Sequence, residues 1–91
     1  MQITKDVKFL TSLQSTLEFI AKDSLNQALL FNSELNKKID DLKFMPFKFR
    51  KSLYHFDENI RDLIYKGYCI PYLVEDEKIV ILNIFKNNQE R

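Results

Sequence analysis

Hydrophobic residues recur at spacings of three and four along two successive stretches near the start of the chain, and this pattern predicts two amphipathic helices. Asp6 is placed to cap the first helix, which should end near Lys22-Asp23. A capping box at Ser24-Leu25-Asn26-Gln27 begins the second helix, and Pro46 should end it, because a proline disfavours the helical conformation of the residue before it. The apolar stripes are Leu10, Leu13, Leu17, Ile20 and Ala21 in the first helix, and Ala28, Phe31, Leu35, Ile39 and Leu42 in the second. So short a connection predicts an antiparallel helical hairpin.

The last third of the chain has the patterns of β-strands. Residues 60–65 alternate between two faces, residues 68–74 follow after a two-residue turn at Lys66-Gly67, and residues 79–85 are apolar almost throughout. The first of these strands should carry Arg61, Leu63 and Tyr65 on one face and Ile60, Asp62 and Ile64 on the other. Pro71 cannot donate a ladder hydrogen bond, so the second strand needs a bulge or a register that leaves this nitrogen unpaired. The pattern predicts a three-stranded antiparallel meander.

The remaining segments complete an α+β order of elements. Residues 2–5 suit an edge strand, residues 47–59 are aromatic and basic without a clear period and are expected to form a loop, and residues 86–91 form a polar tail. We therefore expect a two-layer fold in which an N-terminal strand and an antiparallel helical hairpin pack on the three-stranded meander. Ninety-one residues are too few for two cores, so residues 1–91 should form a single domain.

Composition limits the function classes further. The 14 basic and 13 acidic side chains nearly cancel, which argues against a protein that coats nucleic acid through charge alone but leaves room for a local basic patch. One cysteine allows no intramolecular disulfide, and no signal peptide or apolar run of about 20 residues is present, so we expect a cytoplasmic protein without a membrane segment. One Cys and one His cannot supply a four-ligand zinc site, and one glycine cannot make a phosphate-binding loop; neither a metal nor a cofactor is expected.

Three short motifs follow one another in the predicted meander: Ile60-Arg61-Asp62-Leu63, Gly67-Tyr68-Cys69-Ile70-Pro71-Tyr72 and Ile79-Val80-Ile81-Leu82. Upstream, Leu17-Glu18-Phe19-Ile20 and the stretch from Leu42 to Pro46 fall within the first helix and at the end of the second. In this order and at these spacings the motifs resemble the signature of the RelE/ParE toxin superfamily, and the resemblance extends over nearly the whole chain. It is closer to the ParE-like branch.

The resemblance implies a toxin of a bacterial type II toxin–antitoxin system, with growth inhibition and plasmid stabilisation as its associated effects. RelE-type members cut mRNA in the ribosomal A site, whereas ParE-type members poison DNA gyrase. Both are neutralised by a cognate antitoxin that wraps its C-terminal segment, expected to be acidic and amphipathic, over the toxin. Operator DNA would be bound only through the antitoxin.

One departure from the nuclease pattern favours the gyrase mechanism. RelE-like nucleases carry a phosphate-gripping arginine after the Gly-Tyr of the second meander strand, where this chain has Cys69, and they place Arg or a His-Tyr pair after the last strand, where this chain has Phe85-Lys86-Asn87-Asn88-Gln89. Cleavage by 2′-OH attack needs a base, an acid and a cation over the developing charge. We therefore expect a toxin that binds and poisons DNA gyrase. The alternatives are a ribosome-dependent endoribonuclease, or a degenerate member that binds its antitoxin without toxicity.

The candidate residues fall into three groups, each with a structural alternative. Target contact is expected from Arg50, Lys51 and Arg61, antitoxin contact from Phe47, Phe49, Tyr54, Leu13 and Leu17, and, in the nuclease alternative, catalysis from Arg61, Tyr72, Lys86 and His55. Arg61 could equally tie its strand to the helix ends through a carboxylate. The basic cluster of Lys43, Lys48, Arg50 and Lys51 could be a solvated charge run, and its aromatic neighbours could be core residues. A free cysteine such as Cys69 is more often a small core residue than a reactive thiol. A lone loop histidine such as His55 is more often simply exposed than catalytic.

Overall fold

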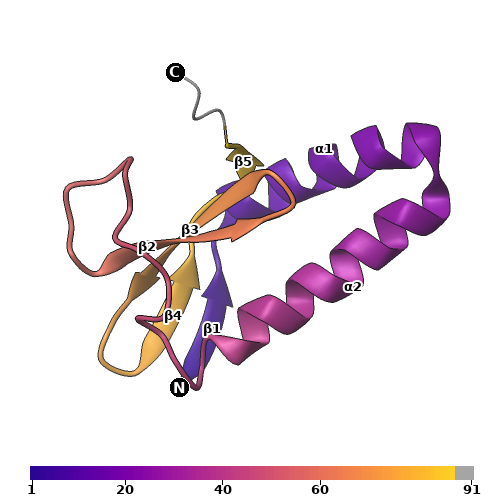
Figure 1. Cartoon of the computed structure of the whole chain (residues 1–91). Helices are drawn as coiled ribbons and strands as arrows, with labels where there is room; N and C mark the ends of the chain where they lie inside the picture. Colours follow the sequence, from indigo (N-terminus) through magenta and orange to yellow (C-terminus); the bar gives the residue numbers. More distant parts are fainter. Residues whose placement is uncertain (88–91) are drawn as a thin grey trace.

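The computed structural model describes residues 1–87, in which a helical hairpin lies against one face of a mixed β-sheet (Figure 1). The elements are β1 (Gln2–Lys5), α1 (Val7–Asp23), α2 (Leu25–Asp41), β2 (Ile60–Tyr65), β3 (Tyr68–Val74), β4 (Lys78–Ile81) and β5 (Phe85–Lys86). The predicted α+β, two-layer architecture is confirmed.

The helix boundaries follow from two capping residues. The Asp6 carboxylate accepts a hydrogen bond from the Lys8 amide at 2.8 Å and starts α1. Ser24 serves both helices, since its amide donates to the Ile20 carbonyl at the end of α1 and its hydroxyl accepts from the Gln27 amide at the start of α2. Because a single residue joins the helices, the chain reverses sharply, and the predicted hairpin is confirmed.

The second helix ends earlier than the sequence suggested. Its last residue is Asp41 rather than the residue before Pro46. The amides of Leu42, Lys43 and Phe44 each bond a carbonyl three residues back, which tightens the chain into a turn before the proline is reached.

The buried face of α1 also differs from the predicted stripe. Phe9 is fully buried, whereas Leu10 is 48% exposed. Adjacent helical residues point about 100° apart, so only one of the two can face the sheet. Phe9, Leu13 and Leu17 are spaced four residues apart, so all three lie on the face of α1 that is turned toward the sheet.

The sheet has the strand order β1-β4-β3-β2 (Figure 1). β1 forms the predicted edge strand and runs parallel to β4, with Ile3 opposite Ile79, while the other pairs are antiparallel. The third strand predicted over residues 79–85 is interrupted: β4 and β5 both pair with β3, with a break between Ile81 and Phe85. Lys86, expected in a polar tail, belongs to β5 instead.

Pro71 explains where that break falls. Its carbonyl accepts a hydrogen bond from the Leu82 amide at 2.9 Å. Because the nitrogen and carbonyl of one strand residue point to the same side, the missing N–H of Pro71 faces the interruption between β4 and β5. The expectation that this nitrogen needs a bulge or an unpaired register is confirmed.

The β2–β3 turn requires left-handed backbone. Lys66 has φ 49° and Gly67 has φ 83°, as in the type I′ turns that join two strands by two residues. An added Cβ at Gly67 would meet no atom within 4 Å. Glycine is therefore favoured there by backbone conformation and not by lack of space.

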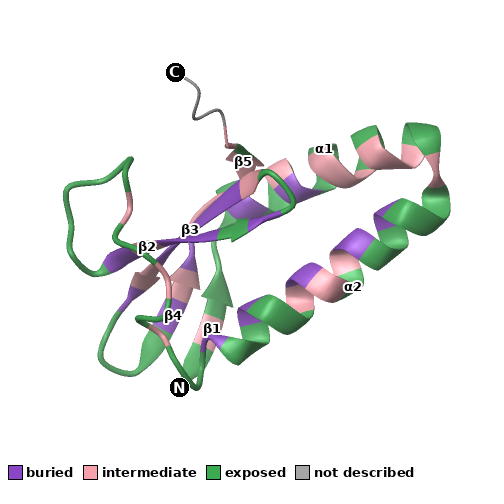
Figure 2. Cartoon of the chain, in the orientation of Figure 1, coloured by how far each residue is buried: buried purple, intermediate pink, exposed green. Residues whose placement is uncertain are grey.

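The main core lies between the hairpin and the sheet, where Figure 2 shows buried residues on the inner sides of the helices. Its members are Phe9, Leu13, Phe31, Leu35, Ile39, Leu42, Leu63, Tyr65, Ile70, Tyr72, Val74, Ile79, Ile81 and Ile84. Asp62 and Cys69 are fully buried as well, although their strand positions alternate with those of Leu63 and Ile70. Both faces of the β2–β3 ladder are therefore covered. No helix among residues 1–87 is long and apolar enough to cross a bilayer.

Candidate functional site

The basic loop, residues 47–59, is fastened to the free edge of β2. Lys51 and Arg61 form an isolated antiparallel bridge, the Asp62 amide donates to the Arg50 carbonyl at 3.1 Å, and the Ser52 amide donates to the Ile60 carbonyl at 2.8 Å. The segment is thus mainly a loop, as predicted, but its middle adds a short stretch of β-pairing to the sheet. This pairing brings the three predicted target-contact residues, Arg50, Lys51 and Arg61, together.

Arg61 and Tyr72 fix the start of the basic loop. The Arg61 guanidinium donates to the Phe49 carbonyl at 3.1 Å and lies 4.8 Å from the ring centre of Phe47. The Tyr72 hydroxyl donates to the Pro46 carbonyl at 2.7 Å. Arg61 therefore does tie its strand to another segment, but through a backbone carbonyl and an aromatic ring rather than through a carboxylate.

The buried side chain of Asp62 holds the middle of the basic loop in place. It is fully buried, its Oδ2 lies 3.6 Å from an Arg50 nitrogen, and the same oxygen accepts the Leu53 amide at 3.1 Å. A buried carboxylate is tolerated only when it is paired and hydrogen-bonded, so this loop conformation and this residue depend on each other. This role is not among those expected from the sequence. The available signal was an acidic residue in the middle of a strand, at a position that alternates with those of Arg61 and Leu63.

Cys69 lies beside Asp62 and is fully buried. Burial, and after it the neighbouring Asp62 carboxylate, raises the pKa of the thiol to about 12. The side chain is therefore neutral and enclosed. The interpretation of Cys69 as a core residue agrees with this geometry.

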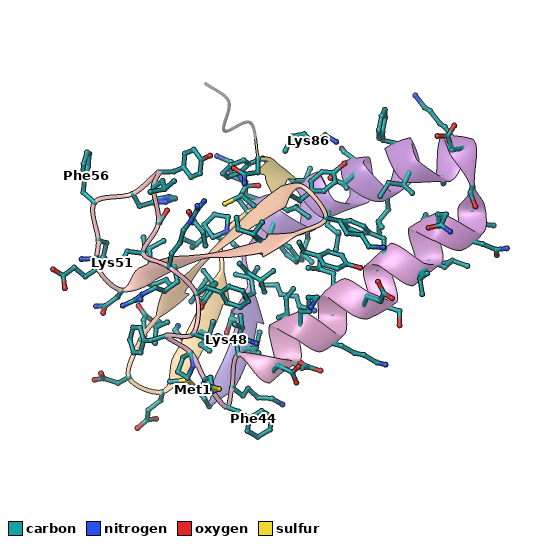
Figure 3. The ribbon with its side chains drawn as sticks, in the orientation of Figure 1. Met1, Phe44, Lys48, Lys51, Phe56 and Lys86 are labelled. Carbon is teal, nitrogen blue, oxygen red and sulfur yellow. The ribbon has the colours of Figure 1, made fainter. Side chains whose placement is uncertain are left out.

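The four alternative nuclease residues have different side-chain partners. Arg61 and Tyr72 are register partners, but Tyr72 is fully buried, and burial raises its pKa to about 12. The Lys86 ammonium lies 4.9 Å above the Tyr68 ring, next to the β2–β3 turn (Figure 3). His55 Nδ1 lies 3.1 Å from the Ser52 hydroxyl oxygen in the basic loop. Each side chain thus has its own partner, although the contact between Tyr54 and Phe85 brings the basic loop beside β5.

An apolar groove of about 380 Å³ runs between α1 and α2. Leu13 and Leu17, two of the predicted antitoxin-contact residues, lie in it together with Leu10 and Leu29. The groove also contains Ala21, Leu25 and Ala28, with Gln14, Glu18 and Asn32 as its polar residues. Leu10, which is absent from the core, is therefore part of this second apolar surface.

The other predicted antitoxin-contact residues lie outside the groove. Phe47 lies under the Arg61 guanidinium, and Phe49 packs against the main core. Tyr54 makes an edge-to-face contact with Phe85, at 5.1 Å between ring centres, and its hydroxyl donates to Asn87. The five residues are thus divided between the hairpin groove and the basic loop.

The fold matches that of a solved structure. A solved structure described as the chromosomal ParDE TA system from P. aeruginosa has a TM-score of 0.78 and 18% sequence identity to this chain, over 94% of this chain and 95% of that one. No curated protein matches the sequence significantly. The profile of the family described as "ParE toxin of type II toxin-antitoxin system, parDE" matches residues 4–91. The chain therefore belongs to the ParE family of toxins of type II toxin–antitoxin systems.

Proposed function

We propose that this ParE-family toxin acts by binding and poisoning DNA gyrase, and not by cutting mRNA. The observation that carries the proposal is the environment of Cys69, which is fully buried and protonated at the position where a nuclease of this superfamily would hold the scissile phosphate. A neutral thiol inside the protein can neither contact a phosphate nor offset the charge of a pentacoordinate transition state.

The remaining polar groups support the same proposal. The buried Tyr72 hydroxyl is bonded to the Pro46 carbonyl, and the Arg61 guanidinium is bonded to the Phe49 carbonyl. General acid–base catalysis requires groups within hydrogen-bond reach of one reacting centre. Lys86 lies over the Tyr68 ring, and His55 lies beside the Ser52 hydroxyl.

We further propose that the cognate antitoxin neutralises the toxin through the groove between α1 and α2. An amphipathic helix binds such a groove by placing its apolar face against apolar side chains, and Leu10, Leu17 and Leu29 offer that surface. Its acidic face would stay in solvent or meet lysines outside the groove. Operator DNA is then contacted by the antitoxin and not by this chain.

Among the proposed target-contact residues, Lys51 allows the cleanest test. Arg50 pairs with the buried Asp62, and Arg61 holds the Phe49 carbonyl, so replacing either one also disturbs the loop. Lys51 has an exposed side chain and joins the β2 edge through its backbone. Lys51→Ala should reduce toxicity without a change in stability, whereas Lys37→Ala on the exposed side of α2 should change neither.

The mechanism is tested by two assays on the same toxin. Purified chain should inhibit gyrase supercoiling and trap cleaved DNA, and induced cells should become filamentous with no new mRNA 5′ ends. Codon-phased mRNA cuts together with normal supercoiling would overturn the proposal in favour of the nuclease. A chain that does neither, yet binds the antitoxin, would be a degenerate family member.

A further inference from the structure

The tip of the basic loop, residues 53–56, presents apolar side chains to solvent. Phe56 has a relative exposure of 112% and points away from the body of the protein (Figure 3), and Leu53 and Tyr54 are exposed as well. Three exposed large apolar residues within four positions are unusual in a loop, where polar residues normally face water. In protein complexes, buried aromatic side chains supply much of the binding energy.

The N-terminal side of this tip is held by hydrogen bonds to β2 and within the loop. The Ser52 amide donates to the Ile60 carbonyl at 2.8 Å, and the Leu53 amide donates to the buried Asp62 at 3.1 Å. The Tyr54 amide donates to the Ser52 hydroxyl at 3.1 Å.

The C-terminal side is held in the same way. The Asp57 carboxylate accepts the Asn59 amide at 2.8 Å, and its carbonyl accepts the Ile60 amide at 3.0 Å. The Asn59 carbonyl in turn accepts the Val74 amide at 2.9 Å, which ties this side to β3. A loop fixed at both ends loses less conformational entropy on binding, so an exposed aromatic residue on it contributes more affinity.

The charges next to Phe56 indicate the class of partner. Asp57 and Glu58 follow it directly and are exposed, and these two carboxylates line one shallow pocket with Phe56 and a single lysine, Lys51. Two carboxylates would repel the phosphates of a nucleic acid or of an anionic lipid surface. They complement an apolar protein pocket whose rim offers basic groups to the two carboxylates and an acidic group to Lys51. An acidic antitoxin segment would be repelled by the same carboxylates, and the groove proposed for it lies in the hairpin, at the other end of the molecule from this loop (Figure 1).

We propose that the toxin contacts its protein target through this loop tip, with Phe56 inserted into an apolar pocket of the target. The proposal rests on the proposed function, in which the toxin acts by binding a protein, and it adds the residue and the chemistry of the contact. Asp62 is a positioning residue for this contact, because it acts through the backbone of Leu53.

The test compares full-length Phe56→Ala with Phe44→Ala, since Phe44 is 78% exposed and lies far from the tip (Figure 3). Phe56→Ala should reduce potency by about tenfold or more in both the gyrase and the growth assay, as expected for loss of an aromatic anchor. Phe44→Ala should keep full potency. Both variants should keep the wild-type denaturation midpoint and antitoxin affinity.

A third variant separates a protein partner from a nucleic acid. Glu58→Gln should weaken the toxin if the pocket has a basic rim, whereas it should strengthen the toxin if phosphates are the partner, and a stronger toxin would overturn the proposal. Full potency of Phe56→Ala would overturn it too, as would a loss of antitoxin affinity at unchanged potency. If wild-type chain leaves gyrase untouched but stops growth, and Phe56→Ala does not stop growth, then the gyrase assignment fails and the loop contact stands. A wild-type chain inactive in both assays overturns both proposals.

Discussion

Arg61 on β2 and Tyr72 on β3 are directly opposite each other in the sheet, and their side chains hold one stretch of backbone. Arg61 donates to the Phe49 carbonyl and Tyr72 donates to the Pro46 carbonyl, at 3.1 and 2.7 Å. The pair thereby joins the end of the helical hairpin to the sheet. It also fixes the backbone at the start of the basic loop. Arg61 and Tyr72, which both belong to the family motifs, therefore have a structural role.

Removing either of these two side chains should destabilise the fold. Tyr72→Phe leaves the Pro46 carbonyl without its donor and should lower the free energy of unfolding by about 0.5–1.5 kcal/mol. Arg61→Ala should lower it by roughly 1–3 kcal/mol, because it also uncovers Phe47. Urea denaturation measures the free energy of unfolding of both variants, with Lys51→Ala as the control. An Arg61→Ala midpoint equal to that of the control would show that the contact is unimportant.

Cys69 should be inert in the folded protein. A thiol-specific reagent attacks the thiolate, and here the thiol is fully buried and its pKa is raised to about 12. Under native conditions the thiol should therefore be labelled only when the structure opens. The labelling rate should rise as the denaturant concentration rises. Rapid labelling of native protein, at the rate found in urea, would mean that the loop does not cover this face of the sheet.

Stability should fall at alkaline pH. In the folded chain the pKa of Cys69 and that of Tyr72 are raised to about 12, whereas in the unfolded chain they have their usual values of 9.0 and 10.0. Between those values and 12 the folded state binds more protons than the unfolded state, so the free energy of unfolding decreases as pH rises. Urea midpoints measured from below pH 9 upward should show this decline. The decline should be smaller in the double variant Cys69→Ala, Tyr72→Phe, and an equal decline would assign the effect to other groups.

Two neighbouring leucines of α2 allow a matched test of the antitoxin groove, because only one of them lines it. Leu29 lines the groove and is 60% exposed, whereas Leu30 is 46% exposed and lies outside it. Leu29→Glu should abolish the rise in melting temperature that excess antitoxin gives, a stabilisation of about 2.7 kcal/mol at a hundredfold excess over the dissociation constant. Leu30→Glu should keep that rise, and neither change should alter the stability of the free toxin by more than about 0.5 kcal/mol. A rise in melting temperature that persists in Leu29→Glu would place the antitoxin elsewhere.

The sequence by itself determined the elements whose signals are local. Asp6 and Ser24 begin the helices because a side-chain oxygen next to the first turn accepts its unpaired amides. Lys66-Gly67 specifies the hairpin turn because glycine adopts positive φ without strain. The same short-range patterns predicted β2 and β3. They also identified Pro71 as the residue whose missing N–H leaves a gap in the hydrogen-bond ladder. Each of these features depends only on residues a few positions apart.

The tertiary structure decided the features that depend on residues far apart in the chain. Phe9 rather than Leu10 enters the core because the position of the sheet selects one side of α1. Arg61 is held by Phe49, and Asp62 by Arg50 and Leu53, only because the loop returns along the edge of β2. The pairing of β1 with β4 and the placement of Phe56 at an exposed tip likewise follow from long-range backbone contacts. Periodicity cannot reveal these contacts, because it records which face of an element is apolar and not what covers that face.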